Sequence, residues 1–154
     1  MNSLQAHAPA EFSATPDNAV GIKDPNTLYV LIVDDSSVMR DMLNMKLREL
    51  AADSMQLVIE QAESGDEAVT RAQSNAYDVI FMDVEMPGMS GLEACRQIKK
   101  FSASRVAMVS GRDAGDDHTA GHQAGCDNYL TKPPHDTDLR VLLRLASIKK
   151  LTLV

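Results

Sequence analysis

The sequence predicts an α/β fold built on a parallel β-sheet, and three observations indicate it. Short apolar runs alternate five times with segments of helical periodicity, which is typical of strands joined by crossover helices. The runs at residues 28–33 and 79–82 are continuously apolar, as expected of strands that are buried on both faces. Polar or turn-forming residues follow these runs directly. A chain of 154 residues is long enough for one such domain.

The first strand and the first helix are predicted at residues 28–33 and 37–51. Ser36 or Ser37 can cap the helix, because a serine hydroxyl accepts a hydrogen bond from a free N–H of the first turn. The apolar residues of this segment recur at helical spacing, which indicates one face packed on the sheet. They are Val38, Met39, Met42, Leu43, Leu47 and Leu50.

The second strand is predicted at residues 56–62, and its lower apolar content favours a position near an edge of the sheet. Ser64 and Glu67 follow it at the S-x-x-E spacing of a capping box, which indicates the start of a helix. Asn75 and Ala76 end this helix.

The third strand, at residues 79–82, is followed directly by the carboxylate of Asp83. Pro87 and Gly88 then indicate a tight turn. Ser90 can cap the third helix. The apolar face of that helix is Leu92, Cys95 and Ile98.

The last third of the chain contains strands predicted at residues 105–109 and 126–130, with a helix at residues 114–124 between them. Several glycines lie in or beside this helix, and each interior glycine costs about 1 kcal/mol relative to alanine. We therefore expect it to be the most mobile element of the domain. The last helix begins at Asp136 or Thr137. Its core face is Leu139, Leu142, Leu143 and Ala146.

Five parallel strands with helices on both faces favour the flavodoxin-like (βα)5 arrangement, a doubly wound sandwich with strand order 2-1-3-4-5. Residues 1–27 show no apolar periodicity and are rich in Ala, Pro, Ser, Asn and Asp, so we expect a flexible N-terminal tail. The domain is then expected at residues 28–150, with a short C-terminal tail at residues 151–154.

The composition argues against several classes of function. A net charge of −7 argues against direct DNA binding by this chain, because nonspecific binding depends on basic patches. No segment approaches the ~18 consecutive apolar residues of a membrane span. The first residues lack the basic start and apolar core of a signal peptide. Cys95 and Cys126 have no metal-binding spacing, as expected of reduced thiols in a cytoplasmic protein.

Polar side chains that can take part in catalysis or metal binding follow four of the predicted strands. They are Asp34 and Asp35 after the first strand, Asp83 after the third, Ser110 after the fourth and Lys132 after the fifth. The carboxyl ends of parallel strands meet at one edge of a sheet. In the order 2-1-3-4-5 the first and third strands are neighbours, about 4.8 Å apart. We therefore expect the three carboxylates to share the crevice at the topological switch point.

Three crowded carboxylates raise one another's pKa unless a cation neutralises them. Oxygen ligands with open positions for water and phosphate suit Mg²⁺. Lys132 supplies a positive charge for a phosphoryl oxygen, and Ser110 supplies a hydroxyl donor. A carboxylate nucleophile, a metal ion and a cationic side chain are the groups that phosphoryl transfer requires.

Over about residues 28–150 the chain resembles the receiver domain of bacterial two-component response regulators. The resemblance depends on the acidic pair Asp34 and Asp35, Asp83 within D-x-x-M-P-x-M-x-G, Ser110, and Lys132 directly before a proline. Each of these features is common alone. Their combination, in register with the strand ends, is specific.

The resemblance implies that Asp83 accepts a phosphoryl group in a phosphorelay, from a sensor histidine kinase or a histidine phosphotransfer protein. It also implies a Mg²⁺ site. Asp35 would bind the ion directly and Asp34 partly through water, with Asp83 and the backbone carbonyl of Glu85 as further ligands.

The resemblance further implies the roles of three residues near the phosphoryl group. Lys132 would pair with the phosphoryl group, and the Lys132–Pro133 peptide bond would be cis. Ser110 and Tyr129 would act as a switch that turns inward on phosphorylation. The changed surface would then be recognised by a downstream effector protein.

Two other functions fit parts of the sequence. A phosphatase of the haloacid dehalogenase class also forms an aspartyl phosphate, but it requires D-x-D on its first strand, whereas Asp34 and Asp35 are adjacent. A degenerate receiver would act only as an interaction module, although the presence of all the phosphorylation residues argues against this.

Two apolar sets leave alternatives open. A second stripe on the last helix fits either core packing or contact with a partner, such as a second copy in a homodimer. The methionine-rich first helix fits an adaptable core. Kinases of the family that the chain resembles dock near this helix, so its exposed part is a second candidate surface. The two sets are Val141, Leu145 and Ile148, and Met39, Met42 and Met45.

Overall fold

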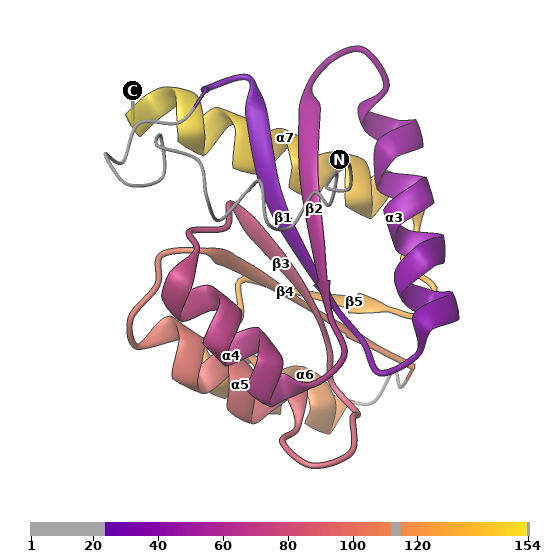
Figure 1. Ribbon diagram of the computed structural model, residues 1–154. Helices are drawn as coiled ribbons and strands as arrows, with labels where there is room; N and C mark the ends of the chain where they lie inside the picture. Colours follow the sequence, from indigo (N-terminus) through magenta and orange to yellow (C-terminus); the bar gives the residue numbers. More distant parts are fainter. Residues whose placement is uncertain (1–23, 112–114, 154) are drawn as a thin grey trace, which may run out of the picture.

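The computed structural model of the chain describes residues 24–111 and 115–153. Its centre is a parallel five-stranded sheet in the order β2-β1-β3-β4-β5 (Figure 1). The predicted fold class and strand order are therefore confirmed. The strands are β1 (Thr27–Val33), β2 (Gln56–Ala62), β3 (Val79–Asp83), β4 (Arg105–Ser110) and β5 (Asn128–Thr131).

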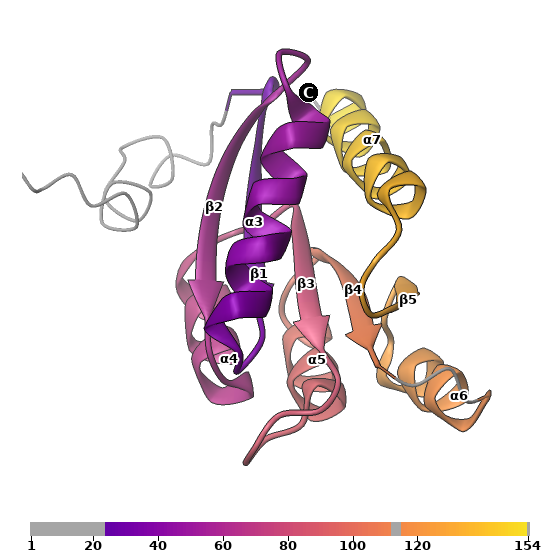
Figure 2. The same ribbon diagram turned by 90° about the vertical axis from the view of Figure 1, so that its right-hand side faces the viewer.

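Five helices cover the two faces of the sheet in the described part of the chain. Figure 2 shows α3 and α7 on one side of the sheet and α4, α5 and α6 on the other. The helices are α3 (Ser37–Ala51), α4 (Gly65–Ser74), α5 (Gly91–Lys99), α6 (Gly115–Ala124) and α7 (Asp136–Leu153). Helix α7 thus continues through most of the segment that the sequence assigned to a C-terminal tail. The segment assigned to an N-terminal tail lies almost entirely outside the described residues.

Each face of the sheet has its own apolar core. Leu31 and Ile80 contribute to the core beneath α4 and α5, whereas their neighbours Ile32 and Phe81 contribute to the core beneath α3 and α7. Side chains of a strand alternate between its faces, so a strand buried on both faces must be apolar at every position. This explains the continuous apolar runs.

Serine caps begin three of the helices, as the sequence predicted. The side chains of Ser36, Ser64 and Ser90 each accept a hydrogen bond from the backbone N–H three residues later, at 3.3, 3.1 and 3.2 Å. Each hydroxyl satisfies a donor that has no partner within its helix. The caps therefore fix where each helix leaves the carboxyl edge of the sheet.

Strand β5 differs from its prediction, because it begins at Asn128 rather than at residue 126. The Cys126 N–H donates to the Gly121 carbonyl at 3.1 Å, which places Cys126 in the turn that closes α6. Strand β5 also includes Thr131, which pairs with Ser110 of β4. The expected mobility of α6 stays a prediction.

None of the helices within the described ranges has the length and apolar character needed to cross a membrane. The longest, α7, buries one face only. Its residues Val141, Leu145 and Ile148 are exposed, so this second stripe does not belong to the core.

Candidate functional site

Three carboxylates meet where β1 and β3 end. Asp34 directly follows β1, and Asp83 is the last residue of the adjacent strand β3. One carboxylate oxygen each from Asp34, Asp35 and Asp83 lies within 4.8 Å of the other two. Asp34 and Asp83 are only 6% and 5% exposed, whereas Asp35 is exposed. The cluster is therefore buried on one side and open to water on the other.

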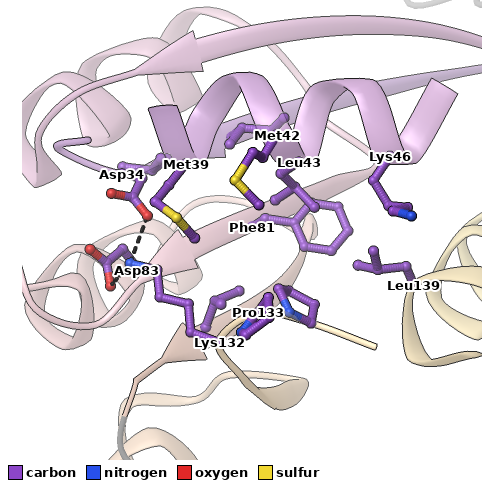
Figure 3. Close-up of a pocket in the computed structure, with 14 residues that line it drawn as sticks. Asp34, Met39, Met42, Leu43, Lys46, Phe81, Asp83, Lys132, Pro133 and Leu139 are labelled. Atoms are coloured by element: carbon purple, nitrogen blue, oxygen red, sulfur yellow. Dashed lines mark ion pairs between the residues drawn. The ribbon is translucent and has the colours of Figure 1, made fainter. Parts of the chain in front are cut away.

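Lys132 joins two of these carboxylates. Its Nζ lies 2.8 Å from Asp34 Oδ2 and 3.3 Å from Asp83 Oδ1 (Figure 3). The backbone N–H of Lys132 donates to the Ser110 carbonyl at 2.8 Å, which holds the lysine beside the end of β4. The Lys132–Pro133 peptide bond is cis, as the resemblance implied. One ammonium group is thus shared between two buried carboxylates.

The charge balance of the cluster shifts the pKa values of its members. Burial, and then the negative charge of Asp34, raise the pKa of Asp83 to about 6, and Lys132 only partly opposes this. Burial lowers the pKa of Lys132, but its hydrogen bond to Asp34 and the charges of both carboxylates outweigh burial and raise it. Within residues 24–111 and 115–153, negative charge is therefore in excess at the cluster, and an added cation would relieve it.

Besides its ion pair with Lys132, Asp34 is held in place by two hydrogen bonds. Its Oδ1 accepts the Ser36 N–H at 2.9 Å. Arg40 Nη1 donates to the Asp34 carbonyl at 2.7 Å, and Arg40 Nε donates to Gln61 Oε1 of β2 at 2.9 Å. Arg40 thus connects α3, the acidic cluster and the edge strand. Sequence reasoning did not identify Arg40, because its position on α3 matches that of an ordinary surface residue.

The segment between β3 and α5 passes close to Asp83. The Val84 N–H donates to the Val109 carbonyl at 3.0 Å, and the Gly91 N–H donates to the Val84 carbonyl at 2.9 Å. A Cβ at Gly91 would overlap the Asp83 carbonyl oxygen, so only glycine fits at this point. The Glu85 N–H makes a long contact of 3.4 Å to Asp83 Oδ1, and the Glu85 side chain is exposed.

Ser110 and Tyr129 occupy different places relative to the acidic cluster. Ser110 is the fully buried last residue of β4, the strand next to β3, and it therefore shares the edge of the sheet with Asp83. Tyr129 is half-buried on β5 and packs against the core beneath α4 and α5. The structure thus brings five of the predicted residues to the carboxylate cluster or its edge, namely Asp34, Asp35, Asp83, Ser110 and Lys132. Tyr129 lies farther back along β5.

The donor set of the cluster fits a hard divalent cation such as Mg²⁺. The three side chains offer only carboxylate oxygens, which such ions prefer. The exposed position of Asp35 leaves one side accessible to water and to a phosphate group. Among the residues that the structure describes, one shared lysine faces three carboxylates, which leaves negative charge for the ion to neutralise.

A mainly apolar cavity of about 80 Å³ adjoins the acidic cluster (Figure 3). It lies between α3 and the segment at Pro133 and Pro134. Asp83 and Lys132 line one end, and Lys46 lines the other. Apolar walls lower the local polarisability and strengthen the interactions between the charges at that end.

Comparison with known sequences identifies the family of the chain. Residues 30–144 match the response regulator receiver domain. Transcriptional regulatory protein ResD of Bacillus subtilis (strain 168) is 39% identical over 127 residues, which cover 79% of this chain and 50% of ResD. Sensory transduction protein RegX3 of Mycolicibacterium smegmatis is 31% identical over 115 residues, covering 75% and 48% of the two chains. The chain thus spans about half the length of these relatives.

Solved structures share the fold. The receiver domain of the Francisella response regulator 1452 matches with a TM-score of 0.69 and 26% identity, covering 79% of this chain and 98% of that domain. Vibrio cholerae chemotaxis protein CheY4 matches with a TM-score of 0.67 and 30% identity, covering 78% and 98%. The fold is thus the CheY-like flavodoxin fold. The chain belongs to the response regulator receiver domain family, and it is a signalling phospho-acceptor domain rather than an enzyme.

Proposed function

We propose that this domain accepts a phosphoryl group on Asp83 in a two-component phosphorelay, and that phosphorylation changes the surface it offers to a partner. The observation that carries the proposal is the position of Asp83. Its carboxylate is buried at the end of β3, within 3.3 Å of Lys132 Nζ and beside two further carboxylates. A nucleophile, a cation and a set of metal ligands therefore adjoin one another.

In the proposed reaction a carboxylate oxygen of Asp83 attacks the phosphorus of a phosphohistidine on a sensor histidine kinase or a histidine phosphotransfer protein. The new O–P bond forms while the P–N bond breaks. The electron pair of the broken bond stays on the imidazole nitrogen, which takes a proton from water. The ammonium of Lys132 stabilises negative charge on one phosphoryl oxygen, and the Ser110 hydroxyl donates to another.

Mg²⁺ is the proposed cofactor. Asp34, Asp35 and Asp83 would hold it, together with the backbone carbonyl of Glu85. When bound, the ion would neutralise the carboxylates and polarise the phosphoryl group. Asp34 is already fixed by Ser36 and Arg40, so one ligand is positioned before the ion binds.

The proposed switch uses Ser110 and Tyr129. Phosphorylation adds negative charge at Asp83, which attracts the Ser110 hydroxyl and Lys132. Both residues are joined to β5, because Lys132 follows this strand and donates to the Ser110 carbonyl. A shift there reaches Tyr129, which lies three residues before Lys132. The altered surface of α6, β5 and α7 would then bind a downstream effector protein.

Two exposed apolar sets are the proposed partner surfaces. Val38, Met42 and Met45 of α3 are exposed, so the expectation that Val38 and Met42 pack on the sheet is wrong. Val38 lies in the first turn of α3, at the edge that carries Asp83, where a phosphodonor protein must approach. The exposed stripe of Val141, Leu145 and Ile148 on α7 suits a second copy in a homodimer or an effector. A cytoplasmic location follows from the proposed phosphodonors.

ResD is named a transcriptional regulatory protein, and this chain covers 50% of its length. For the complete protein we therefore propose that the output can be transcription. DNA would be contacted outside this domain, because a net charge of −7 opposes binding by the domain itself.

The test is Mg²⁺-dependent labelling by acetyl phosphate, read by intact mass. The wild-type chain is expected to gain one phosphoryl group, and Asp83→Asn is expected to gain none. Asp138→Asn, an equivalent change on the exposed surface of α7, is the matched control and is expected to label normally. EDTA is expected to prevent labelling.

Three outcomes would contradict the proposal. Labelling that survives Asp83→Asn would remove Asp83 from its assigned role. Failure to label, with no transfer from any histidine kinase, would identify a degenerate receiver. Turnover of p-nitrophenyl phosphate would indicate a phosphatase.

A further inference from the structure

The ring of Tyr129 occupies space beside Gly121 of α6 that any side chain at that position would fill. A Cβ placed on Gly121 would lie 2.8 Å from Tyr129 Cδ2 and 3.0 Å from Tyr129 Cε2. Favourable contacts between carbon atoms are about 3.5–4.0 Å long, so these distances are overlaps. The hydroxyl oxygen of Tyr129 is buried, which shows that the ring points inward beneath α6.

The end of α6 is held against the domain, which limits how it can yield to a larger residue. The Gly121 carbonyl accepts the Cys126 N–H at 3.1 Å, and Cys126 Sγ would lie 3.2 Å from an added Cβ. Ala124, one turn later, is buried, and the thiol of Cys95 on α5 lies 3.7 Å from its carbonyl oxygen. Rotation of the Tyr129 ring about its χ1 is therefore the movement that relieves the overlap.

The orientation of the ring is connected to the acidic cluster through β5. Tyr129 pairs with Met108 of β4, and two residues further along each strand Thr131 pairs with Ser110. The Lys132 N–H then donates to the Ser110 carbonyl. The strand that carries the ring thus also positions the lysine that contacts Asp34 and Asp83.

We infer that Gly121 is a positioning residue, whose missing side chain allows Tyr129 to lie inward and so sets the balance between inward and outward ring orientations. The ring already lies inward in this structure, so the inward turn expected on phosphorylation would be a shift in the balance between the two orientations. The regulatory meaning of this balance rests on the proposed function, in which Tyr129 responds to phosphorylation. Any larger residue at position 121 shifts the ring toward the outward orientation and changes the surface formed by α6 and β5.

The test is nitration of tyrosines in the Gly121→Ala variant by tetranitromethane, without Mg²⁺ or a phosphodonor. Peptide masses distinguish Tyr129 from Tyr29 and Tyr77, which act as internal references. We expect nitration of Tyr129 to be several-fold faster than in the wild type, with the two references unchanged. Gln123→Ala also places an alanine on α6, but at an exposed position, and is expected to leave all three rates unchanged.

An unchanged Tyr129 rate in a folded Gly121→Ala variant would overturn the inference, and so would equal acceleration of all three tyrosines. If Gly121→Ala does not fold, the double variant Gly121→Ala/Tyr129→Ala decides. Recovery of folding would support a clash with the ring, and continued failure would overturn the inference. Because the assay involves no phosphorylation, failure of Asp83 to label would leave its result intact.

Discussion

Asp83 and Glu60 are both buried, ion-paired carboxylates, yet their surroundings differ. Glu60 of β2 is 3% exposed. Its Oε1 accepts hydrogen bonds from the Tyr77 hydroxyl at 2.6 Å and from Arg71 Nη1 at 3.0 Å. Asp83 shares its cation, Lys132, with a second buried carboxylate, Asp34. Each buried carboxylate thus has a cationic partner, so the presence of a cation does not distinguish the Glu60 site from the Asp83 site.

The difference lies in the other carboxylates near each pair. Arg71 also contacts Glu67 at 2.9 Å, but that side chain is 35% exposed, so water screens its charge. Asp34 and Asp83 are buried together, with Asp35 beside them. The charge of Glu60 is thus balanced by Arg71, although its Oε2 is buried without a hydrogen-bond partner in the described part of the chain. Among the described residues, the Asp83 cluster has negative charge left for another cation. This contrast separates a structural ion pair from a candidate site.

The largest expected effect comes from removing the cation at the acidic cluster. Lys132→Ala is expected to slow phosphorylation of Asp83 by acetyl phosphate about 100-fold, because charge on the phosphoryl oxygens loses a preorganised partner. Initial rates of mass gain in saturating Mg²⁺ measure this. Lys149→Ala, which changes an exposed lysine of α7, is the control. A Lys132→Ala rate close to that of Lys149→Ala would show that Lys132 has no part in the reaction.

Removing Arg71, the cation beside Glu60, is expected to affect the stability of the domain rather than phosphorylation. Arg71→Met leaves the buried Glu60 carboxylate with only the Tyr77 hydroxyl as a partner. We expect the free energy of unfolding to fall by about 2 kcal/mol. This is less than for a fully buried pair, because water reaches part of the Arg71 side chain. Urea unfolding followed by circular dichroism measures the change in stability. Phosphorylation of the folded variant should be unchanged.

Glu67→Gln is the matched control for Arg71→Met, because it removes only the surface partner of the same arginine. Glu67→Gln is expected to lower the free energy of unfolding by less than about 1 kcal/mol. Equal costs for the two variants would mean that the buried pair with Glu60 contributes nothing beyond the surface pair.

The smallest expected effect compares removal of one negative charge at each cluster. In EDTA, Asp34→Asn is expected to raise the free energy of unfolding by about 1 kcal/mol, because it relieves repulsion of Asp83. Glu60→Gln is expected to lower it by a similar amount, because Arg71 and Tyr77 lose a charged acceptor. Changes of opposite sign in the free energy of urea unfolding would support the difference between the two clusters. A loss of stability in both variants would contradict it.

The sequence predicted the sheet and the acidic cluster for the same physical reason. Apolar runs mark strands buried on both faces, and parallel strands bring the residues after them to one edge. Asp34, Asp83, Ser110 and Lys132 could therefore be placed near one another without any knowledge of side-chain contacts. The roles assigned to them by resemblance stay predictions until phosphorylation is measured.

The contacts between distant side chains could not be predicted. Glu60 lies in a strand interpreted only as less apolar, and its partners Arg71 and Tyr77 are 11 and 17 residues away. The fit of Tyr129 against Gly121 depends on how closely α6 approaches β5, which no sequence period encodes. Such contacts follow from packing, and packing is known only once the elements are placed.

Mapping the phosphorylated residue tests the central claim most directly. Borohydride reduces an aspartyl phosphate to homoserine, so peptide masses after reduction of the labelled wild-type chain show which carboxylate carried the phosphoryl group. We predict conversion at residue 83 alone. Conversion at Asp34 or Asp35, or reduction of a glutamyl phosphate at Glu60, would contradict the account.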